Sequence, residues 1–202
     1  MTLAVVDYGA GNLTSVTKAF AAIGVETRVV RDGLGVDSAD AIVVPGVGHF
    51  AATSAIGPVL RAAIRRAVGQ GRPLLGICLG MQWLFDGSAE APGVAGLGVC
   101  SGLCEPLDDG LKVPHAGWNS LTRRESPSAL LTGIEPEAWA YFTHSFAAPV
   151  GADATAVTTY GRPFASCVER GRVFGAQWHP EKSGRVGRRL LENFAAIAAG
   201  AA

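Results

Sequence analysis

The sequence has little charge and no excess of either sign. Lysine and arginine together number 17, aspartate and glutamate also number 17, and charged residues make up only 17% of the chain. Such a balance gives no electrostatic footprint for nucleic acid or an anionic membrane, so we expect neither as a partner. No apolar run is long enough to cross a bilayer. No basic segment precedes the apolar residues 3–6, so we expect no signal peptide and a cytoplasmic protein.

Cysteine is also scarce, with only four in 202 residues. A chain of this length can bury a core of its own, so a disulfide framework is not needed for stability. Cys100 and Cys104 have the spacing of half a metal site, but no second pair or nearby histidine completes it, so we predict no bound metal. Hydrophobic residues form 49% of the chain, which is typical of a globular protein. We expect one domain over residues 1–202.

Apolar segments alternate with helical patterns in the first half of the chain. Residues 3–6, 25–30, 41–44 and 73–77 have the composition of buried strands. Helical spacing of apolar residues follows the first strand and recurs after Pro58. This alternation predicts a parallel sheet with helices on both faces, a three-layer α/β/α architecture.

The pattern changes after residue 87, where short strand-like runs occur with few helical stretches. These runs cover residues 98–103, 111–114, 119–122, 139–142, 154–159, 165–168 and 173–177. They predict a mostly antiparallel or mixed sheet in the second half. A final helix is predicted from apolar residues at helical spacing, namely Val186, Leu190, Leu191, Phe194 and Ile197.

One strand-to-helix junction contains a candidate nucleophile. Residues 76–80 have the pattern Gly-x-Cys-x-Gly, the cysteine form of a nucleophile elbow, in which the glycines leave room for close backbone approach. The helix that follows would favour the thiolate of Cys78, and the N–H of Leu79 would stabilise an oxyanion. The alternative is a structural cysteine packed at a strand end. The choice between them depends on a histidine elsewhere in the chain.

Among the four histidines, His179 has the strongest context. It follows a predicted strand and precedes Pro-Glu, so its backbone is restricted and Glu181 can reach the far ring nitrogen. A base that is oriented by a carboxylate and faces the Cys78 thiol predicts a catalytic triad. Without the elbow, His-Pro-Glu would be a simple turn with a surface glutamate. We interpret His49 as a loop histidine and His115 as an interface or structural histidine.

The glycine-rich loop at residues 8–12 follows the first strand, as a dinucleotide-binding loop would. Its spacing fails the Gly-x-Gly-x-x-Gly pattern, because Thr14 occupies the last position. We therefore expect no nucleotide cofactor.

The elbow and the His-Pro-Glu motif resemble the class I glutamine amidotransferases, whose flavodoxin-like fold the resemblance implies. Four stretches are similar to the glutaminase subunits of imidazole glycerol phosphate synthase, and with the elbow they extend from residue 7 to 184. These stretches are residues 7–13, 45–48, 113–119 and 179–184. Ala116 stands where a methionine is expected and Trp178 where phenylalanine is commoner, and both departures look like packing changes.

The resemblance implies a role for individual residues. Cys78 would be the nucleophile, His179 the acid and base, and Glu181 the residue that orients it. The oxyanion hole would combine Leu79 with the Gly46, Val47 and Gly48 loop, although the residues alone leave a mere turn open there. Glutamine would be held by Gln82, Glu90 and the backbone of His144, Ser145 and Phe146. The partner interface would include Asn12, Trp118, Tyr141 and Lys182.

The implied activity is hydrolysis of L-glutamine to glutamate, without metal or cofactor. Ammonia would pass to a separate (β/α)8-barrel cyclase subunit of a heterodimer, which makes imidazole glycerol phosphate and aminoimidazole carboxamide ribotide in histidine biosynthesis. The alternatives are a glutaminase subunit of another synthase, a stand-alone γ-glutamyl hydrolase and a non-catalytic docking module. The Gly-Trp-Asn block at residues 117–119 argues against the first, and the intact triad against the last.

Overall fold

A nine-stranded mixed sheet forms the centre of the protein in this computed structural model, which describes residues 1–107 and 110–200. The strand order is β2-β1-β3-β4-β12-β11-β10-β7-β8. The first five strands in this order are parallel: β2 (Glu26–Val30), β1 (Thr2–Val6), β3 (Ala41–Gly46), β4 (Leu74–Cys78) and β12 (Val173–Ala176). The last four are antiparallel: β11 (Arg162–Arg170), β10 (Ala154–Tyr160), β7 (His115–Arg123) and β8 (Ala138–His144). The predicted change from parallel to antiparallel pairing is confirmed.

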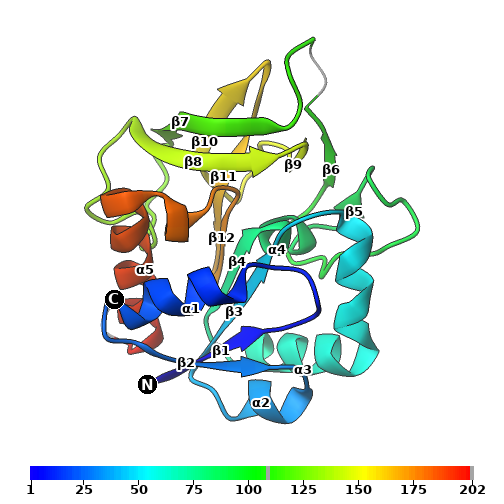
Figure 1. Ribbon diagram of the computed structural model, residues 1–202, viewed down its shortest axis with the longest axis vertical. Helices are drawn as coiled ribbons and strands as arrows, with labels where there is room; N and C mark the ends of the chain where they lie inside the picture. Colours follow the sequence, from blue (N-terminus) through cyan, green and yellow to red (C-terminus); the bar gives the residue numbers. More distant parts are fainter. Residues whose placement is uncertain (108–109, 201–202) are drawn as a thin grey trace.

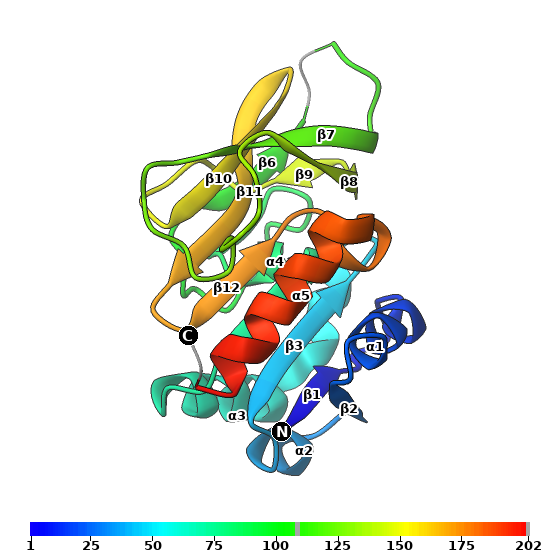
Figure 2. The same ribbon diagram turned by 90° about the vertical axis from the view of Figure 1, so that its left-hand side faces the viewer.

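Helices cover both faces of the parallel half, which confirms the three-layer α/β/α architecture (Figures 1 and 2). Because both faces of the sheet are covered, strands β3, β4 and β12 are buried along their whole length, whereas the edge strand β2 is partly exposed. Successive side chains of a strand point to opposite faces of the sheet. In β1, Leu3 and Val5 pack with α1 (Leu13–Ala21) and α5 (Gly184–Ala198), whereas Ala4 and Val6 pack with α2 (Gly33–Asp37) and α3 (Gly57–Gly69). Each fully buried valine or leucine of such a strand contributes about 1.5–3 kcal/mol.

Three neighbouring parallel strands end at the same edge of the sheet and carry the predicted catalytic segments. Strand β3 ends at Gly46, β4 ends at Cys78, and His179 follows the end of β12. The β3–β4 register places Gly46 beside Cys78. Three short helical segments follow these strand ends: η1 (Phe50–Ile56), α4 (Leu79–Trp83) and η2 (Pro180–Lys182). This edge is where ligands bind in open α/β sheets.

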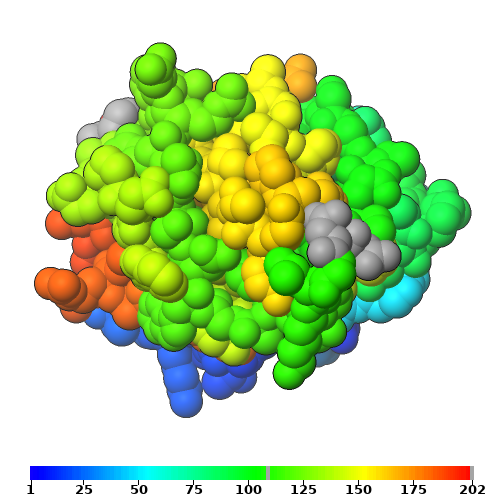
Figure 3. Space-filling model, turned by 90° about the horizontal axis from the view of Figure 1, so that it is seen from above, coloured from blue at the N-terminus to red at the C-terminus, as the bar shows by residue number. Residues whose placement is uncertain are grey.

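The antiparallel strands rise above this edge, together with a small sheet of β5 (Gly87–Ser88), β6 (Leu103–Pro106) and β9 (Phe146–Ala147). Seen from above, β7, β8, β10 and β11 form the upper face of the molecule (Figure 3). Among the described parts of the chain, no helix is both long and apolar enough to cross a bilayer.

Two predicted strands are wrong. Of the strand predicted at residues 98–103, only Leu103 is extended, as the first residue of β6. Residues 98–102 are irregular, because Gly98 and Gly102 adopt left-handed φ values of 68° and 115°, and the N–H groups of Val99 and Cys100 donate to the carbonyl of Leu84. Residues 111–114 pair with none of the described strands and lead into β7 as an irregular, exposed segment.

Neither the α-helix α2 nor the 3₁₀ helix η1 was predicted from the sequence. Helix α2 spans five residues, too few for an apolar period to show, and Asp32 caps it by accepting from the N–H of Gly35 at 2.9 Å.

Candidate active site

The elbow after β4 has the strained geometry that the motif predicts. Cys78 adopts φ 53° and ψ −109°, a conformation that side chains rarely take. The flanking glycines permit it, because a Cβ on Gly76 would lie 2.6 Å from the carbonyl oxygen of Gly80, and one on Gly80 would overlap the carbonyl of Val44. The turn therefore presents the cysteine at the sheet edge, where it starts helix α4.

The sulfur of Cys78 is held between a hydrogen-bond donor and an acceptor. The side-chain Nε2 of Gln177 donates to Sγ at 3.7 Å, and the thiol can donate to the carbonyl oxygen of Thr143 at 3.8 Å. A donor favours the thiolate and an acceptor favours the thiol, so both protonation states have a partner. No sequence pattern indicated Gln177 or Thr143 as neighbours of the nucleophile, because both contacts join residues far apart in the chain.

The other three cysteines are free thiols buried within the hydrophobic core. Burial raises the pKa of Cys100 and Cys167 to about 12 and raises the pKa of Cys104 as well. These thiols are protonated and unreactive at neutral pH.

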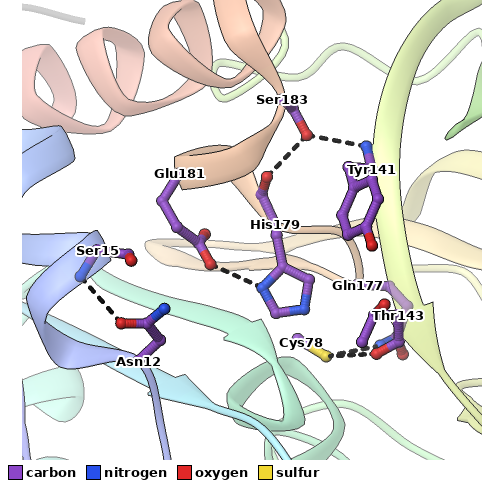
Figure 4. A network of polar contacts seen from close by, with 9 residues as sticks. All are labelled: Asn12, Ser15, Cys78, Tyr141, Thr143, Gln177, His179, Glu181 and Ser183. Atoms are coloured by element: carbon purple, nitrogen blue, oxygen red, sulfur yellow. Dashed lines mark hydrogen bonds and ion pairs between the residues drawn. The ribbon is translucent and has the colours of Figure 1, made fainter. Parts of the chain in front are cut away.

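The carboxylate of Glu181 orients the imidazole of His179. Its Oε1 accepts from Nδ1 of His179 at 2.8 Å, and the two side chains are only 3% and 1% exposed. The proline between them begins the tight turn η2, which brings Glu181 back toward the ring. In Figure 4 the imidazole lies between Glu181 and Cys78, with Nε2 away from the carboxylate. Within the described residues this buried Nε2 has no hydrogen-bond partner, so it is available for proton transfer.

The charge state of His179 reflects its two neighbours. Burial alone would lower the pKa of the imidazole, but the Cys78 sulfur and the Glu181 carboxylate outweigh burial and raise it to about 10. An imidazolium beside a thiolate is the arrangement that an activated cysteine nucleophile requires.

Backbone contacts lock His179 in place (Figure 4). Its N–H donates to the carbonyl of Tyr141 in β8 at 2.9 Å, and its carbonyl accepts from the Ser183 hydroxyl at 2.7 Å. The same hydroxyl accepts from the N–H of Tyr141 at 2.9 Å. The backbone of His179 is thereby fixed between β8 and the start of α5.

A pocket of about 240 Å³ opens beside the nucleophile. That volume lies below the usual range for drug-sized ligands and suits a molecule as small as an amino acid. Its lining comprises Gly48, Cys78, Leu79, Gln82, Glu90, Pro114, Thr143, His144, Ser145 and Phe146. The structure thus brings every predicted glutamine-binding residue to one pocket.

Of the predicted oxyanion loop, only Gly48 lines the pocket together with Leu79. Gly48 has a left-handed φ of 96° and nothing crowds its Cα, so the peptide there can adopt conformations closed to other residues. Gly46 packs against the Tyr8 hydroxyl and Leu79, where a Cβ would clash, and Val47 is 37% exposed.

Two polar side chains of the pocket are already bonded within the protein. The Nε2 of Gln82 donates to the carbonyl of Phe146 at 2.7 Å and to Oε1 of Gln177 at 3.2 Å, which leaves Gln82 only its carbonyl oxygen for a ligand. The Oε2 of Glu90 accepts from the N–H of Phe50 at 2.6 Å.

Three of the predicted interface residues, one each from β7, β8 and η2, are neighbours. The rings of Trp118 and Tyr141 meet edge to face at 6.1 Å, and Nζ of Lys182 lies 5.7 Å from the centre of the Tyr141 ring. Trp118 is 52% exposed. Asn12 caps the start of α1, a helix that contacts η2, and its Oδ1 accepts from the N–H of Ser15 at 3.2 Å.

Four further residues were interpreted from the sequence. His49 is an exposed loop residue, as expected. His115 was expected at an interface or in a structural role, and its burial favours the structural role. Trp178 is fully buried, and its Nε1 donates to the sulfur of Cys167 at 3.2 Å, a bond that phenylalanine could not make. Ala116 is exposed, so its departure changes the surface and not the core.

Solved structures share the fold of this chain. A putative GMP synthase protein from Thermoplasma acidophilum has a TM-score of 0.72 at 19% identity and aligns with 99% of this chain and 94% of its own. The structure of PurLQS from Thermotoga maritima has a TM-score of 0.76 at 20% identity, over 97% of this chain and 98% of its own. These likenesses support the three-layer fold.

Proteins related in sequence indicate the family more specifically than the solved structures do. Residues 4–198 match the family model "Glutamine amidotransferase class-I". The protein named "Imidazole glycerol phosphate synthase subunit HisH" from Deinococcus radiodurans is 50% identical over 199 residues, which cover 93% of this chain and 90% of that protein. The protein of the same name from Thermococcus kodakarensis is 46% identical, over 95% and 98%. The chain therefore belongs to the class I glutamine amidotransferases and, within them, to the family of imidazole glycerol phosphate synthase subunits HisH.

Proposed function

We propose that Cys78, His179 and Glu181 are the triad with which this chain, as the glutaminase subunit of imidazole glycerol phosphate synthase in histidine biosynthesis, hydrolyses L-glutamine. The proposal depends on the buried Glu181–His179 hydrogen bond of 2.8 Å, whose imidazole lies beside Cys78, a residue that lines the pocket. The names of relatives up to 50% identical support the synthase and the pathway. The whole chain, residues 1–202, would form one domain.

The first half of the reaction releases ammonia. The thiolate of Cys78 attacks the side-chain carbonyl carbon of glutamine, and the C=O electron pair moves to oxygen. When the tetrahedral intermediate collapses, the C–N bond breaks and the imidazolium of His179 gives its Nε2 proton to the leaving nitrogen. The products of this half are ammonia and a thioester on Cys78.

The second half regenerates the enzyme. His179, now neutral, takes a proton from water as the water oxygen attacks the thioester carbonyl. The C–S bond then breaks, glutamate leaves, and Cys78 and His179 return as thiolate and imidazolium. Glu181 stays ionised throughout and stabilises the imidazolium.

Backbone groups next to the nucleophile would hold the substrate. The N–H of Leu79 and an N–H of the Gly46 to Gly48 loop would stabilise the oxyanion, and a missing donor of this kind costs roughly 10²–10³ in rate. The free carbonyl of Gln82 and the carboxylate of Glu90 are acceptors suited to the α-ammonium group of glutamine. The backbone of residues 144–146 would position the rest of the amino acid.

The partner would be the (β/α)8-barrel cyclase subunit of the synthase. The exposed Trp118, beside Tyr141 and Lys182, forms an aromatic patch with one cation next to the triad, and such patches are typical of protein interfaces. Asn12, at the start of α1, would complete the interface. Lys182 directly follows the triad residue Glu181, so a salt bridge from Lys182 to a partner carboxylate would couple docking to the triad.

The experiment measures glutamate release by the isolated chain, by its complex with the cyclase of the same organism, and by the complex with the nucleotide substrate. We expect the rate of glutamate release to rise steeply across the three. Ammonia made without an acceptor is lost to solvent, and a Gly46 to Gly48 loop with an inactive and an active state would prevent that loss. Lys182→Ala should lose the stimulation, whereas Lys18→Ala, an exposed lysine of α1, should keep it. Full activity of the isolated chain would support a stand-alone hydrolase instead.

A further inference from the structure

A chain of side-chain hydrogen bonds runs from strand β7 to the wall of the pocket. The Nδ2 of Asn119 lies 3.3 Å from Nε2 of His115, and Nδ1 of His115 lies 3.3 Å from Nε2 of His144. The Nδ1 of His144 in turn lies 2.9 Å from the carbonyl oxygen of Phe146. The β7–β8 register makes this possible, because it places His115 directly opposite His144.

The proton positions along this series of hydrogen bonds follow from the groups at its two ends, Phe146 and Asn119. The carbonyl of Phe146 can only accept, so Nδ1 of His144 carries the proton. Burial lowers the pKa of His144 to about 3 and of His115 to about 4, so both rings are neutral at pH 7. The Nε2 of His144 is then an acceptor, and Nδ1 of His115 must carry the second proton.

The contacts of Asn119, at the other end of the series, require the same direction of proton donation. The Oδ1 of Asn119 accepts from the N–H of Ser120 at 2.8 Å, and Nδ2 donates to the carbonyl of Thr159 at 3.0 Å. The amide orientation is therefore fixed, and Nδ2 donates its other proton to the unprotonated Nε2 of His115. Both histidines thus have the Nδ1–H tautomer, and every donor in the chain has an acceptor.

His115 is also fixed by stacking. Its ring lies between Tyr160, at 4.1 Å and 19°, and Phe142, at 4.9 Å and 21°, and the residue is 4% exposed. A buried histidine with both nitrogens bonded and both faces stacked has one orientation.

From these contacts we infer that His115 is a positioning residue of the glutamine pocket, acting through His144 on the carbonyl of Phe146. That carbonyl also accepts from Gln82, whose Nε2 donates as well to Gln177, the donor to the Cys78 sulfur. His115 is thus linked through hydrogen bonds to both the substrate wall and the nucleophile. It touches neither substrate nor reacting atoms. The inference rests on the proposed glutaminase function for its kinetic consequence, but not for its tautomers.

The test uses three variants with matched shapes. His115→Phe keeps the stacked ring and removes both nitrogens. His115→Asn keeps a donor near the position of Nδ1 and removes the ring. Tyr160→Phe removes a hydroxyl that donates to the carbonyl of Lys112 and keeps the ring stacked on His115, so it serves as the control.

The first measurement is two-bond ¹H–¹⁵N correlation NMR of the histidine rings at pH 7. We expect the Nδ1–H tautomer for His115 and His144 in the parent. In His115→Phe, His144 should keep this tautomer, because the carbonyl of Phe146 still accepts from its Nδ1, but its Nε2 resonance should shift because that nitrogen has lost its donor. Nε2–H at His144 in the parent would overturn the inference. This measurement on the parent decides even if a variant fails to fold.

The second measurement is the KM for glutamine in the complex with the cyclase. We expect a rise of about tenfold in His115→Phe, since a buried acceptor loses its donor, with partial recovery in His115→Asn and none of the rise in Tyr160→Phe. Synthesis from added ammonium should stay at the parent rate in all three. Parent-like KM in a folded His115→Phe complex would overturn the inference, whereas a parent that hydrolyses no glutamine would instead contradict the proposed function.

Discussion

The side-chain amide of Gln177, directly after β12, donates to the sulfur of Cys78, at the end of β4, across 3.7 Å. The strands β12 and β4 are adjacent and parallel, and Gln177 is completely buried. Its Oε1 accepts from Gln82, so the amide cannot turn its donor away from the sulfur without losing that second bond. The sulfur of Cys78 is therefore held by a side chain as well as by the elbow.

Replacement of Gln177 by methionine should slow alkylation of Cys78 by iodoacetamide at pH 7 by about 10- to 100-fold. A hydrogen bond to a charged group contributes about 1.5–3 kcal/mol, and its loss disfavours the thiolate. The rate is read from mass spectrometry of the modified chain. Alkylation at the parent rate would show that the Gln177 donor does not stabilise the sulfur.

The carboxylate of Glu181 should be essential for turnover. Glu181→Gln keeps the shape of the side chain but cannot stabilise an imidazolium, so we expect kcat in the complex to fall on the order of 10⁴. Glu192→Gln makes the same change on α5, where Glu192 pairs with the exposed Arg188, and should leave kcat unchanged. If Glu181→Gln turned over glutamine as the parent does, His-Pro-Glu would be only a turn.

The two buried histidines His115 and His144 should make the fold sensitive to mild acid. Their folded pKa values, about 4 for His115 and about 3 for His144, lie below the unfolded value of 6.5, so between these values the unfolded chain binds more protons. The free energy of unfolding therefore falls as pH drops below 6.5, by about 2 kcal/mol per histidine between pH 7 and pH 5. His179 adds little slope there, because its raised pKa keeps it protonated in the folded state and it is also protonated in the unfolded chain below pH 6.5.

Urea unfolding of the parent and of His115→Phe at pH 7 and pH 5 checks this prediction. Because one titrating group is removed, the variant should lose about 2 kcal/mol less than the parent over this interval. Equal losses in the two proteins would show that His115 does not titrate on unfolding.

Local sequence patterns predicted the elements of the candidate active site, but they could not predict contacts between residues that are far apart in the sequence. The elbow at Cys78 and the turn at His179 are each encoded within a few residues, and alternating strands and helices indicated which ends would meet. Gln177, Thr143 and the His115–His144 pair depend on strand order and on the β7–β8 register, to which no short segment is a guide. The wrong strand at residues 98–103 had apolar composition but also two glycines, whose left-handed φ values break an extended chain.

The central claim is that Cys78 makes ammonia for chemistry on another chain, and one comparison tests it most directly. Synthesis by the assembled complex is measured with glutamine and with ammonium salts as the nitrogen source, for the parent and for Cys78→Ala. We predict that the variant loses glutamine hydrolysis on the order of 10⁶-fold and keeps ammonium-dependent synthesis at the parent rate. Glutamine hydrolysis by Cys78→Ala above about a thousandth of the parent rate, far more than such a loss allows, would contradict the account.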